Sequence, residues 1–455
     1  MKRTINMTEG SPAKNILLFS IPVLLGTLFQ QMYNMADTVI VGRFLGEDAL
    51  AAVGSTGSTV YMVIGFTAGL SQGFSILIAQ AFGARRQDDL KMLVAHALFL
   101  TVAISLLFTV PTVLLCRNIL IGMNTPEEIL HYAHSYLQIN FCGILCTMAY
   151  NVAAGILRAM GDSKTPLFFL ILSSFLNIGL DVFFIVVSEL GTAGVALATI
   201  VSQGISAILC YGYMMRQYPF LRLCRSDFRL KPQQIARMLR TGIPMAMNQS
   251  VIALGIMIMQ SGVNTFGASV MAAYAAASKV ENLTSQPMTA LGSGISVFCG
   301  QNFGAQRFDR IQKGVRQGLM MSFLTGCLGM ILYFVAAEPI IHLFIADPSE
   351  ELLLYAKQYL FTAVWFLPAL AWIFLLRSAL VGLGNGSLTL LSGLLELACR
   401  FLCVRFLLPF AGFWCVRLTN PITWVATCAL FICLYIRWER TQIPREGEVS
   451  LNERT

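Results

Sequence analysis

Charged residues are scarce in this sequence. Only 12% of the 455 residues are Asp, Glu, Lys or Arg, whereas 56% are hydrophobic, and the mean hydropathy is +0.70. A soluble domain of this length needs far more charge to cover its surface. Apolar runs of about 20 residues, long enough to cross the hydrocarbon core of a bilayer, instead recur along the whole sequence. The composition therefore predicts an all-α, polytopic membrane protein.

Catalytic and metal-binding motifs are also missing. The sequence contains no P-loop and no HExxH motif, and its four histidines are dispersed. No pair of the twelve cysteines has the spacing of a zinc site, so we interpret them as small packing residues. The polar residues 1–14 precede an apolar run of full span length, which is not the pattern of a signal peptide. We predict that the chain is not an enzyme, carries no cofactor and is not driven by its own ATP hydrolysis.

The apolar runs predict twelve membrane spans, joined by short loops except at 216–234 and 338–350. Lys and Arg gather in the loops of one side, including 216–234, and the positive-inside rule then places both termini and this loop in the cytoplasm. The net charge of +8 is in this interpretation a signal of topology, and we expect no nucleic-acid partner. The spans are expected at 15–41, 49–80, 90–116, 130–157, 165–188, 191–215, 235–262, 270–300, 312–337, 351–379, 387–409 and 412–437.

An internal repeat divides the chain. The segment Gln80–Arg86, QAFGARR, resembles Gln301–Arg307, QNFGAQR, at an offset of 221 residues. Three further matches follow the same order: Ile21-Pro22 with Ile243-Pro244, Gly46 with Gly267, and Gly161 with Gly384. Because each repeat has an even number of spans, the two six-helix lobes should be related by a pseudo-twofold axis along the membrane normal. We predict an N-lobe at 1–215, a cytoplasmic linker at 216–234, a C-lobe at 235–440 and a polar cytoplasmic tail at 441–455.

A proline lies in the first span of each repeat. Pro22 and Pro244 each remove a backbone donor and crowd the preceding turn, so each is expected to bend its helix. Their duplication at the same repeat position favours a hinge function over a passive kink.

Two acidic residues lie within the predicted spans of the N-lobe. Ionisable groups at membrane depth are costly and mark functional sites. Asp37 and Asp181 are both expected in the outer half of the membrane, as the rise of 1.5 Å per residue indicates. Helical spacing and depth predict that four polar residues lie near these two acids: Gln30, Tyr33, Asn177 and Thr199. Carboxylates with neutral oxygens suit Na⁺, for which Asp37 and Asp181 would be the metal ligands, and a buried pair of carboxylates also suits a proton.

The C-lobe has a different polar pattern, with no acid in its first span. Lys279 and Glu281 lie in its second span, and Gln249 and Gln260 lie in its first, so these four are candidate substrate contacts. Glu396 and Arg400 are spaced i, i+4 and are expected to form a structural ion pair.

These residues together resemble the multidrug and toxic compound extrusion (MATE) family over essentially the whole chain. The resemblance rests on the two six-span lobes, the duplicated Gln80 and Gln301 motifs, the loop Gly161–Pro166, and the pattern of Pro22, Gln30, Tyr33 and Asp37 with Asn177, Asp181 and Thr199. This pattern looks like the N-lobe cation site of the DinF-like branch, where equivalent positions bind the coupling Na⁺ or H⁺. Asn151 on the fourth span matches a further polar position of that site.

The resemblance implies antiport of small organic cations by alternating access in the cytoplasmic membrane of a bacterial cell, with the chain expected to act as a monomer in the lipid bilayer. The C-lobe carboxylates of the NorM-like branch are absent from 235–262 and 352–379. A lipid-linked-sugar flippase of related fold remains an alternative, but it would need a basic cavity for its anionic lipid. A membrane-embedded transferase would need longer polar loops.

Overall fold

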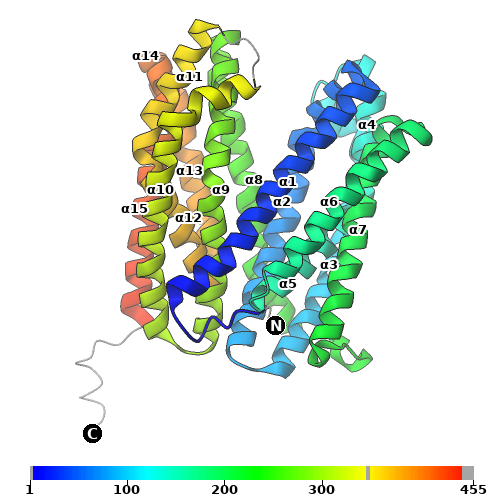
Figure 1. Cartoon of the computed structure of the whole chain (residues 1–455), viewed down its shortest axis with the longest axis vertical. Helices are drawn as coiled ribbons and strands as arrows, with labels where there is room; N and C mark the ends of the chain where they lie inside the picture. The colour runs from blue at the N-terminus through cyan, green and yellow to red at the C-terminus, as the bar shows by residue number, and fades with distance from the viewer. Residues whose placement is uncertain (1–3, 345–348, 443–455) are drawn as a thin grey trace. The chain divides into compact units, whose positions relative to one another are not determined.

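The apolar runs form long α-helices in the computed structural model, which describes residues 4–344 and 349–442 (Figure 1). A helix satisfies its backbone hydrogen bonds internally, as a bilayer requires of any spanning segment. The first repeat consists of α1 (Pro12–Leu45), α2 (Glu47–Gly83), α3 (Gln87–Gly122), α4 (Glu127–Cys142), α5 (Ile144–Ala159), α6 (Lys164–Val182), η1 (Phe183–Val187) and α7 (Gly191–Gln217).

The second repeat follows a linker that contains the short helices η2 (Pro219–Leu221) and η3 (Arg225–Phe228). It consists of α8 (Pro232–Asn264), α9 (Ala268–Gly304), α10 (Phe308–Phe344), α11 (Glu350–Ala363), η4 (Val364–Phe366), α12 (Leu367–Gly382), α13 (Ser387–Leu402), η5 (Cys403–Leu407), α14 (Leu408–Ala411) and α15 (Phe413–Gln442). The predicted tail at 441–455 lies outside the described residues beyond Gln442.

The helices make up the twelve predicted spans. In the described part of the chain, nine helical runs are long and apolar enough to cross a membrane, and the pair α4–α5, bent by 47°, makes a tenth. The polar helix α9 and the interrupted run from α13 to α14 complete the set. Most helices extend a few residues beyond the predicted ends, because the polar turns at the membrane surface continue the helix. The twelve-helix fold is therefore confirmed.

Backbone conformations repeat between the halves. Gly46 and Gly267, which precede α2 and α9, have φ angles of 86° and 90°, a region that glycine adopts without strain. At the turns after these helices, Arg85 and Gln306 have φ angles of 56° and 57°. The two π-helical turns, η1 and η5, also occupy corresponding places. The duplication seen in the sequence is thus a duplication of local structure.

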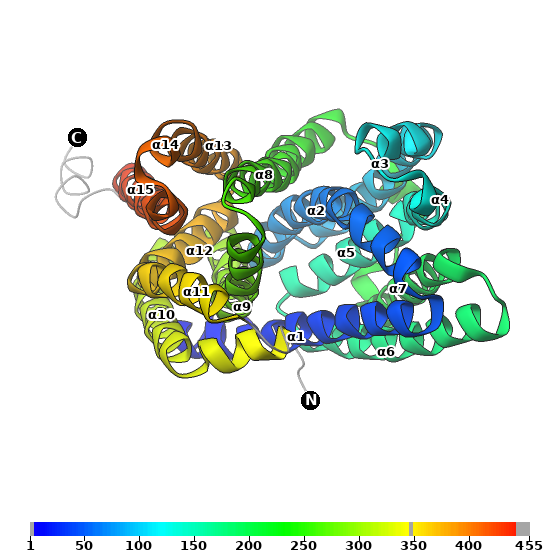
Figure 2. The same cartoon turned by 90° about the horizontal axis from the view of Figure 1, so that it is seen from above.

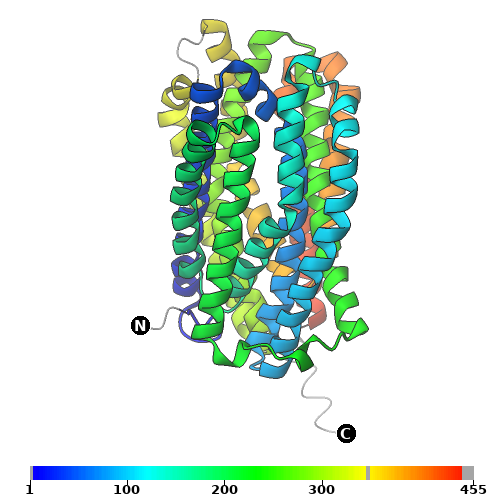
Figure 3. The same ribbon diagram turned by 90° about the vertical axis from the view of Figure 1, so that its right-hand side faces the viewer.

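The described chain divides into two compact units that differ from the predicted lobes at two places. Unit 1 comprises residues 4–6 and 21–249, and unit 2 comprises 7–20 and the described residues from 250 onward. Residues 7–20, expected in the N-lobe, thus belong to unit 2, and residues 235–249, expected in the C-lobe, belong to unit 1. The helices of unit 1 run side by side in Figure 3, and α13 and α15 of unit 2 pack together in Figure 2.

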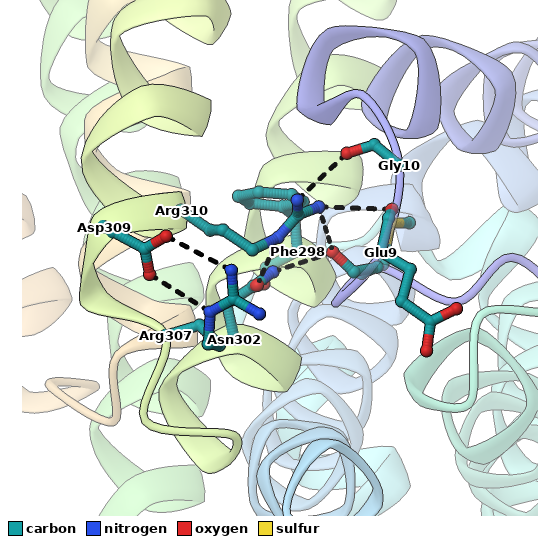
Figure 4. A network of polar contacts seen from close by, with 8 residues as sticks. Glu9, Gly10, Phe298, Asn302, Arg307, Asp309 and Arg310 are labelled. Carbon is teal, nitrogen blue, oxygen red and sulfur yellow. Dashed lines mark hydrogen bonds and ion pairs between the residues drawn. The ribbon is translucent and has the colours of Figure 1, made fainter.

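Residues 7–20 belong to unit 2 because its polar side chains hold their backbone (Figure 4). Arg310 donates to the carbonyl oxygens of Met7, Glu9 and Gly10 at 2.9 to 3.2 Å. Asn302 donates to the Met7 carbonyl at 3.0 Å, and the Met7 N–H donates to the side-chain oxygen of Gln301 at 3.1 Å. Gln301 and Asn302 of the duplicated motif, together with Arg310, therefore hold residues 7–10 in place. Sequence periodicity gives no sign of such contacts.

The first half of α8 belongs to unit 1 because glycines let it approach α2 closely. An ideal Cβ on Gly73 would lie 2.4 Å from Gly242 Cα, and one on Gly69 would lie 2.6 Å from Ala246 Cα. Small residues at such a crossing are a common means of packing helices in membranes.

Candidate functional site

Asp181 is the most deeply buried acidic residue of the predicted site. It lies on α6, two residues before the π-helical turn η1, and its side chain is 0% exposed. Neither of its carboxylate oxygens has a hydrogen-bond partner in the described structure. The half-buried carboxylate of Asp37 on α1 lies against it, within hydrogen-bonding reach. Two ionised carboxylates offer only acceptors, so a bound cation or a proton is needed to satisfy them.

Asn177 connects Asp37 to α7. With its amide turned to satisfy both neighbours, its nitrogen donates to Asp37 Oδ1 at 3.0 Å and its oxygen accepts from the Thr199 backbone N–H at 3.3 Å. The opposite orientation gives a 3.4 Å bond to Thr199 Oγ1, but it points the amide oxygen at a carboxylate, which is repulsive. We therefore adopt the first. Asp37, Asn177, Asp181 and Thr199 thus lie together in the structure.

Phenol groups form the next part of the cluster. Tyr33 on α1 interacts electrostatically with both carboxylates, and its side chain forms a hydrogen bond with Gln30, one turn earlier. Tyr136 on α4 lies near the same carboxylates and near Tyr33. Sequence reasoning missed Tyr136, because a single tyrosine in an apolar span gives no distinctive signal. Asn151 on α5 is half-buried and makes no hydrogen bond with the carboxylate pair in the described structure.

A pocket opens beside this cluster within unit 1. It lies among α2, α4, α5 and α7, and its space of about 380 Å³ is partly open to the outside. Thr199 belongs both to the pocket wall and to the carboxylate cluster. Gln203, one turn further along α7, has a buried side-chain oxygen that finds no partner in the described part of the chain. The wall combines apolar and polar side chains: Val60, Val63, Ile64, Thr67, Asn140, Phe141, Ile144, Thr147, Thr199 and Gln203. Such a mixture suits an amphipathic small molecule.

Both prolines predicted as hinges lie inside continuous helices. Pro22 lies in α1 and Pro244 in α8. The boundary between the compact units falls within two residues of Pro22, between Ser20 and Ile21. In α8 the boundary falls between Gln249 and Ser250, a turn and a half after Pro244.

A second polar cluster lies within unit 2. Tyr359 donates to Glu281 Oε2 at 2.9 Å, and the Asn420 amide contacts both Glu281 oxygens at 3.3 Å and the Tyr359 oxygen at 2.7 Å. Tyr274 packs edge-on against Tyr359, with ring centroids 5.4 Å apart. Glu281 was predicted as a substrate contact, whereas its partners on α11 and α15 were not.

The other predicted contacts of the C-lobe do not join this cluster. Gln249, in the second repeat, belongs to compact unit 1, where an ideal Cβ on Gly65 would lie 3.4 Å from the Gln249 Cβ. Gln260 donates to Asn264 on its own helix at 2.8 Å. Lys279 is exposed, because two residues along a helix turn the side chain to a different face.

The predicted ion pair of Glu396 with Arg400 is also wrong. In the described structure no ion pair joins them, and Arg400 Nε and Nη1 are buried without a hydrogen-bond partner. Glu396 interacts instead with Arg377 of α12. Residues at i and i+4 share a helix face. Here Glu396 interacts with α12, whereas Arg400 lies against Gly255 of α8, so the two side chains have different neighbours.

Two repeats of six spans and two facing carboxylates within those spans define a class, the secondary transporters built from internal repeats. The chain belongs to the MatE family, whose sequence profile matches residues 22–183 and 244–403. The two matches begin at Pro22 and Pro244 and thus cover both repeats.

Relatives and solved structures agree with this membership. The chain is 32% identical to the probable multidrug resistance protein YoeA of Bacillus subtilis (strain 168) over 80% of this chain and 79% of that protein. It is 26% identical to the probable multidrug resistance protein NorM of Thermotoga maritima, over 96% and 95% of the two chains. An outward-facing multidrug resistance MATE family transporter of the MOP superfamily has the same fold, with a TM-score of 0.89 and 21% identity over 97% and 98% of the two chains.

Proposed function

We propose that this chain exports small amphipathic organic cations in exchange for Na⁺ or H⁺ bound between Asp37 and Asp181. The observation that carries the proposal is the completely buried Asp181 carboxylate, which lies against a second carboxylate and has no hydrogen-bond donor within residues 4–344 and 349–442. An uncompensated buried charge is strongly unfavourable. The pair therefore has a strong affinity for whatever positive charge can reach it.

A cationic solute is the complement of such a site. The pocket beside Thr199 offers apolar walls and a few polar groups, next to the two acids. An ion, a proton and an organic cation would all neutralise the same charge, and their competition is the basis of exchange. The names of the Bacillus subtilis and Thermotoga maritima relatives, as probable multidrug resistance proteins, support drugs as substrates. The acidic character of the site favours cations over the anionic lipid of a flippase.

Dye efflux tests this function. Bacterial cells that lack their own exporters would express the chain and be loaded with ethidium, and efflux would be recorded with a Na⁺ gradient and with the proton gradient collapsed. We expect Asp181→Asn to abolish coupled efflux at equal expression, because it removes the charge for which ion and dye compete. Asp48→Asn, an exposed acid in the first turn of α2, is the matched control. Efflux by Asp181→Asn at the wild-type rate would refute the proposal.

We further propose that the chain acts in the bacterial cell membrane with both termini and the linker 216–234 in the cytoplasm, as the distribution of Lys and Arg indicates. A cysteine replacing the exposed Gln233 tests this, in a background in which the chain's exposed cysteines Cys142, Cys224 and Cys433 are serine. An impermeant maleimide should label it only after the cells are opened. Labelling of intact cells to the same extent would invert the topology.

A further inference from the structure

Arg400 of unit 2 is a half-buried arginine, two of whose guanidinium nitrogens are enclosed. Its Nε and Nη1 atoms are buried and have no hydrogen-bond partner among the residues that the structure describes. Arginine remains charged under all ordinary conditions, so it cannot relieve burial by losing its proton. A fixed charge with free donors in a protein interior is unfavourable unless an anion pairs with it.

An acid that interacts with this guanidinium has hydrogen-bond partners of its own. Glu281 lies close enough to Arg400 to interact electrostatically, but no ion pair joins them in the part of the chain that the structure describes. Its oxygens accept instead from Tyr359 and Asn420. Unit 2 thus holds the Glu281 carboxylate and the Arg400 guanidinium near each other. Each can still form an ion pair with a ligand group of opposite charge.

The backbone leaves room for the guanidinium. An ideal Cβ on Gly255 of α8 would lie 2.8 Å from Arg400 Nη1 and 3.3 Å from its Cδ. A glycine at this position therefore lets the side chain lie across α8. Tyr274, which packs edge-on against Tyr359, also interacts electrostatically with both Glu281 and Arg400. Tyr274 therefore lies near both charges.

The position of Arg400 in the repeat is informative. Arg400 lies three residues before the π-helical turn η5, and Asp181 lies two residues before the corresponding turn η1. The two halves therefore place charged residues of opposite sign at nearly the same structural position. Single π-turns in helices are often found at functional sites.

We propose that Arg400 and Glu281 form a second binding site, within unit 2, for small molecules that carry both a carboxylate and a cationic group. Arg400 donates to the carboxylate through Nε and Nη1, in the geometry that guanidinium and carboxylate share. Glu281 attracts the cationic part, and Tyr274 and Tyr359 contact the apolar body. The inference rests on the proposed export function and assigns the carboxylate of such a substrate to Arg400 in unit 2.

Two fluorescent probes that differ in one charge separate this site from the one in unit 1. Rhodamine B carries a free carboxylate and a delocalised cation, and its ethyl ester keeps only the cation. Their binding to the purified full-length protein in lipid nanodiscs can be measured by fluorescence polarisation. Arg400→Gln should weaken binding of the acid by about tenfold to a hundredfold, because a charge-assisted pair is lost, and should leave binding of the ester unchanged. Glu281→Gln should weaken both.

Arg405→Gln is the matched control, since Arg405 is an exposed arginine on η5 and should alter neither affinity. If Arg400→Gln does not fold, Gly255→Ala decides, because its new methyl group displaces the flexible guanidinium; it should weaken binding of the acid alone. Equal changes for acid and ester, or none for the acid, would overturn the inference. Dependence of ester efflux on Asp181 tests the proposed function separately.

Discussion

Asn177 is the residue through which α6 holds the Asp37 carboxylate, by a bond of 3.0 Å. Replacing it by leucine, a side chain of similar size, removes the donor and leaves Asp37 with less support in its ionised form. Since a hydrogen bond to a charged group contributes about 1.5–3 kcal/mol and Asp37 is only half-buried, we expect the coupling-ion affinity to change by roughly tenfold. The ion concentration that gives half-maximal efflux measures this. Asn34→Ala, an exposed amide on α1, is the control, and identical ion dependence in both variants would contradict the role of Asn177.

The residues that could be found from the sequence are those whose chemistry conflicts with their surroundings. Asp37 and Asp181 are acids in apolar runs, and Asn177 shares a helix face with Asp181. Tyr359 and Asn420 could not be found in this way, because they lie 78 and 139 residues from Glu281 and neither is unusual in its own helix. Only packing between distant helices brings them together.

At the scale of elements, α1 is the helix that carries both the proposed hinge and part of the proposed ion site. Asp37 lies fifteen residues beyond Pro22, so the part of α1 that carries it can move as one body about the proline. We expect Pro22→Ala to restore a backbone donor and stiffen the helix. Efflux should fall severalfold while binding of the coupling ion is retained.

Two measurements on the same purified variant check this separation: equilibrium ion binding and transport in proteoliposomes. Pro111→Ala, another proline inside a helix, in α3, serves as the control. If Pro22→Ala lost ion binding and transport together, the proline would be holding the site rather than acting as a hinge.

Interruptions of helices were harder to predict than their existence. Long apolar runs with short polar turns gave the twelve spans directly. The bend of 47° between α4 and α5 occurs at Gly143, where a single glycine in an apolar run was no clear signal. The π-turns η1 and η5 have no sequence signature, because one extra residue per turn depends on how the helix meets its neighbours.

At the scale of the whole molecule, the sequence repeat and the compact units are different divisions of the same chain. The repeat records six spans in each half, and it was visible because motifs recur at one offset. The units record which residues contact each other, and they assign the beginnings of α1 and α8 to the unit opposite to their repeat. Backbone-to-side-chain bonds such as those of Arg310, and close glycine contacts such as Gly73 with Gly242, determine that assignment. Neither kind of contact has a periodicity.

Competition between ion and substrate is the property that the whole transporter must show if Asp37 and Asp181 bind both. By linkage, the factor by which Na⁺ or H⁺ weakens binding of a cationic dye must equal the factor by which the dye weakens binding of the ion. For a shared site, the apparent dissociation constant of the dye should rise in proportion to the ion concentration once the ion saturates the site. Titrating a fluorescent cation against the purified protein, over a series of Na⁺ concentrations and of pH values, measures the effect and shows which ion causes it.

The variants give this titration its controls. Asp48→Asn should preserve the full competition, and Asp181→Asn should reduce both dye affinity and its dependence on the ion, because one carboxylate alone has less charge to share. Arg400→Gln should leave the competition for a purely cationic dye intact, since its charge lies in unit 2 and the dye has no carboxylate. A dye affinity that responds neither to Na⁺ nor to pH would mean that ion and dye bind to separate charges. The Glu281 carboxylate of unit 2, which accepts hydrogen bonds from Tyr359 and Asn420, would then be the better candidate for binding the cationic dye.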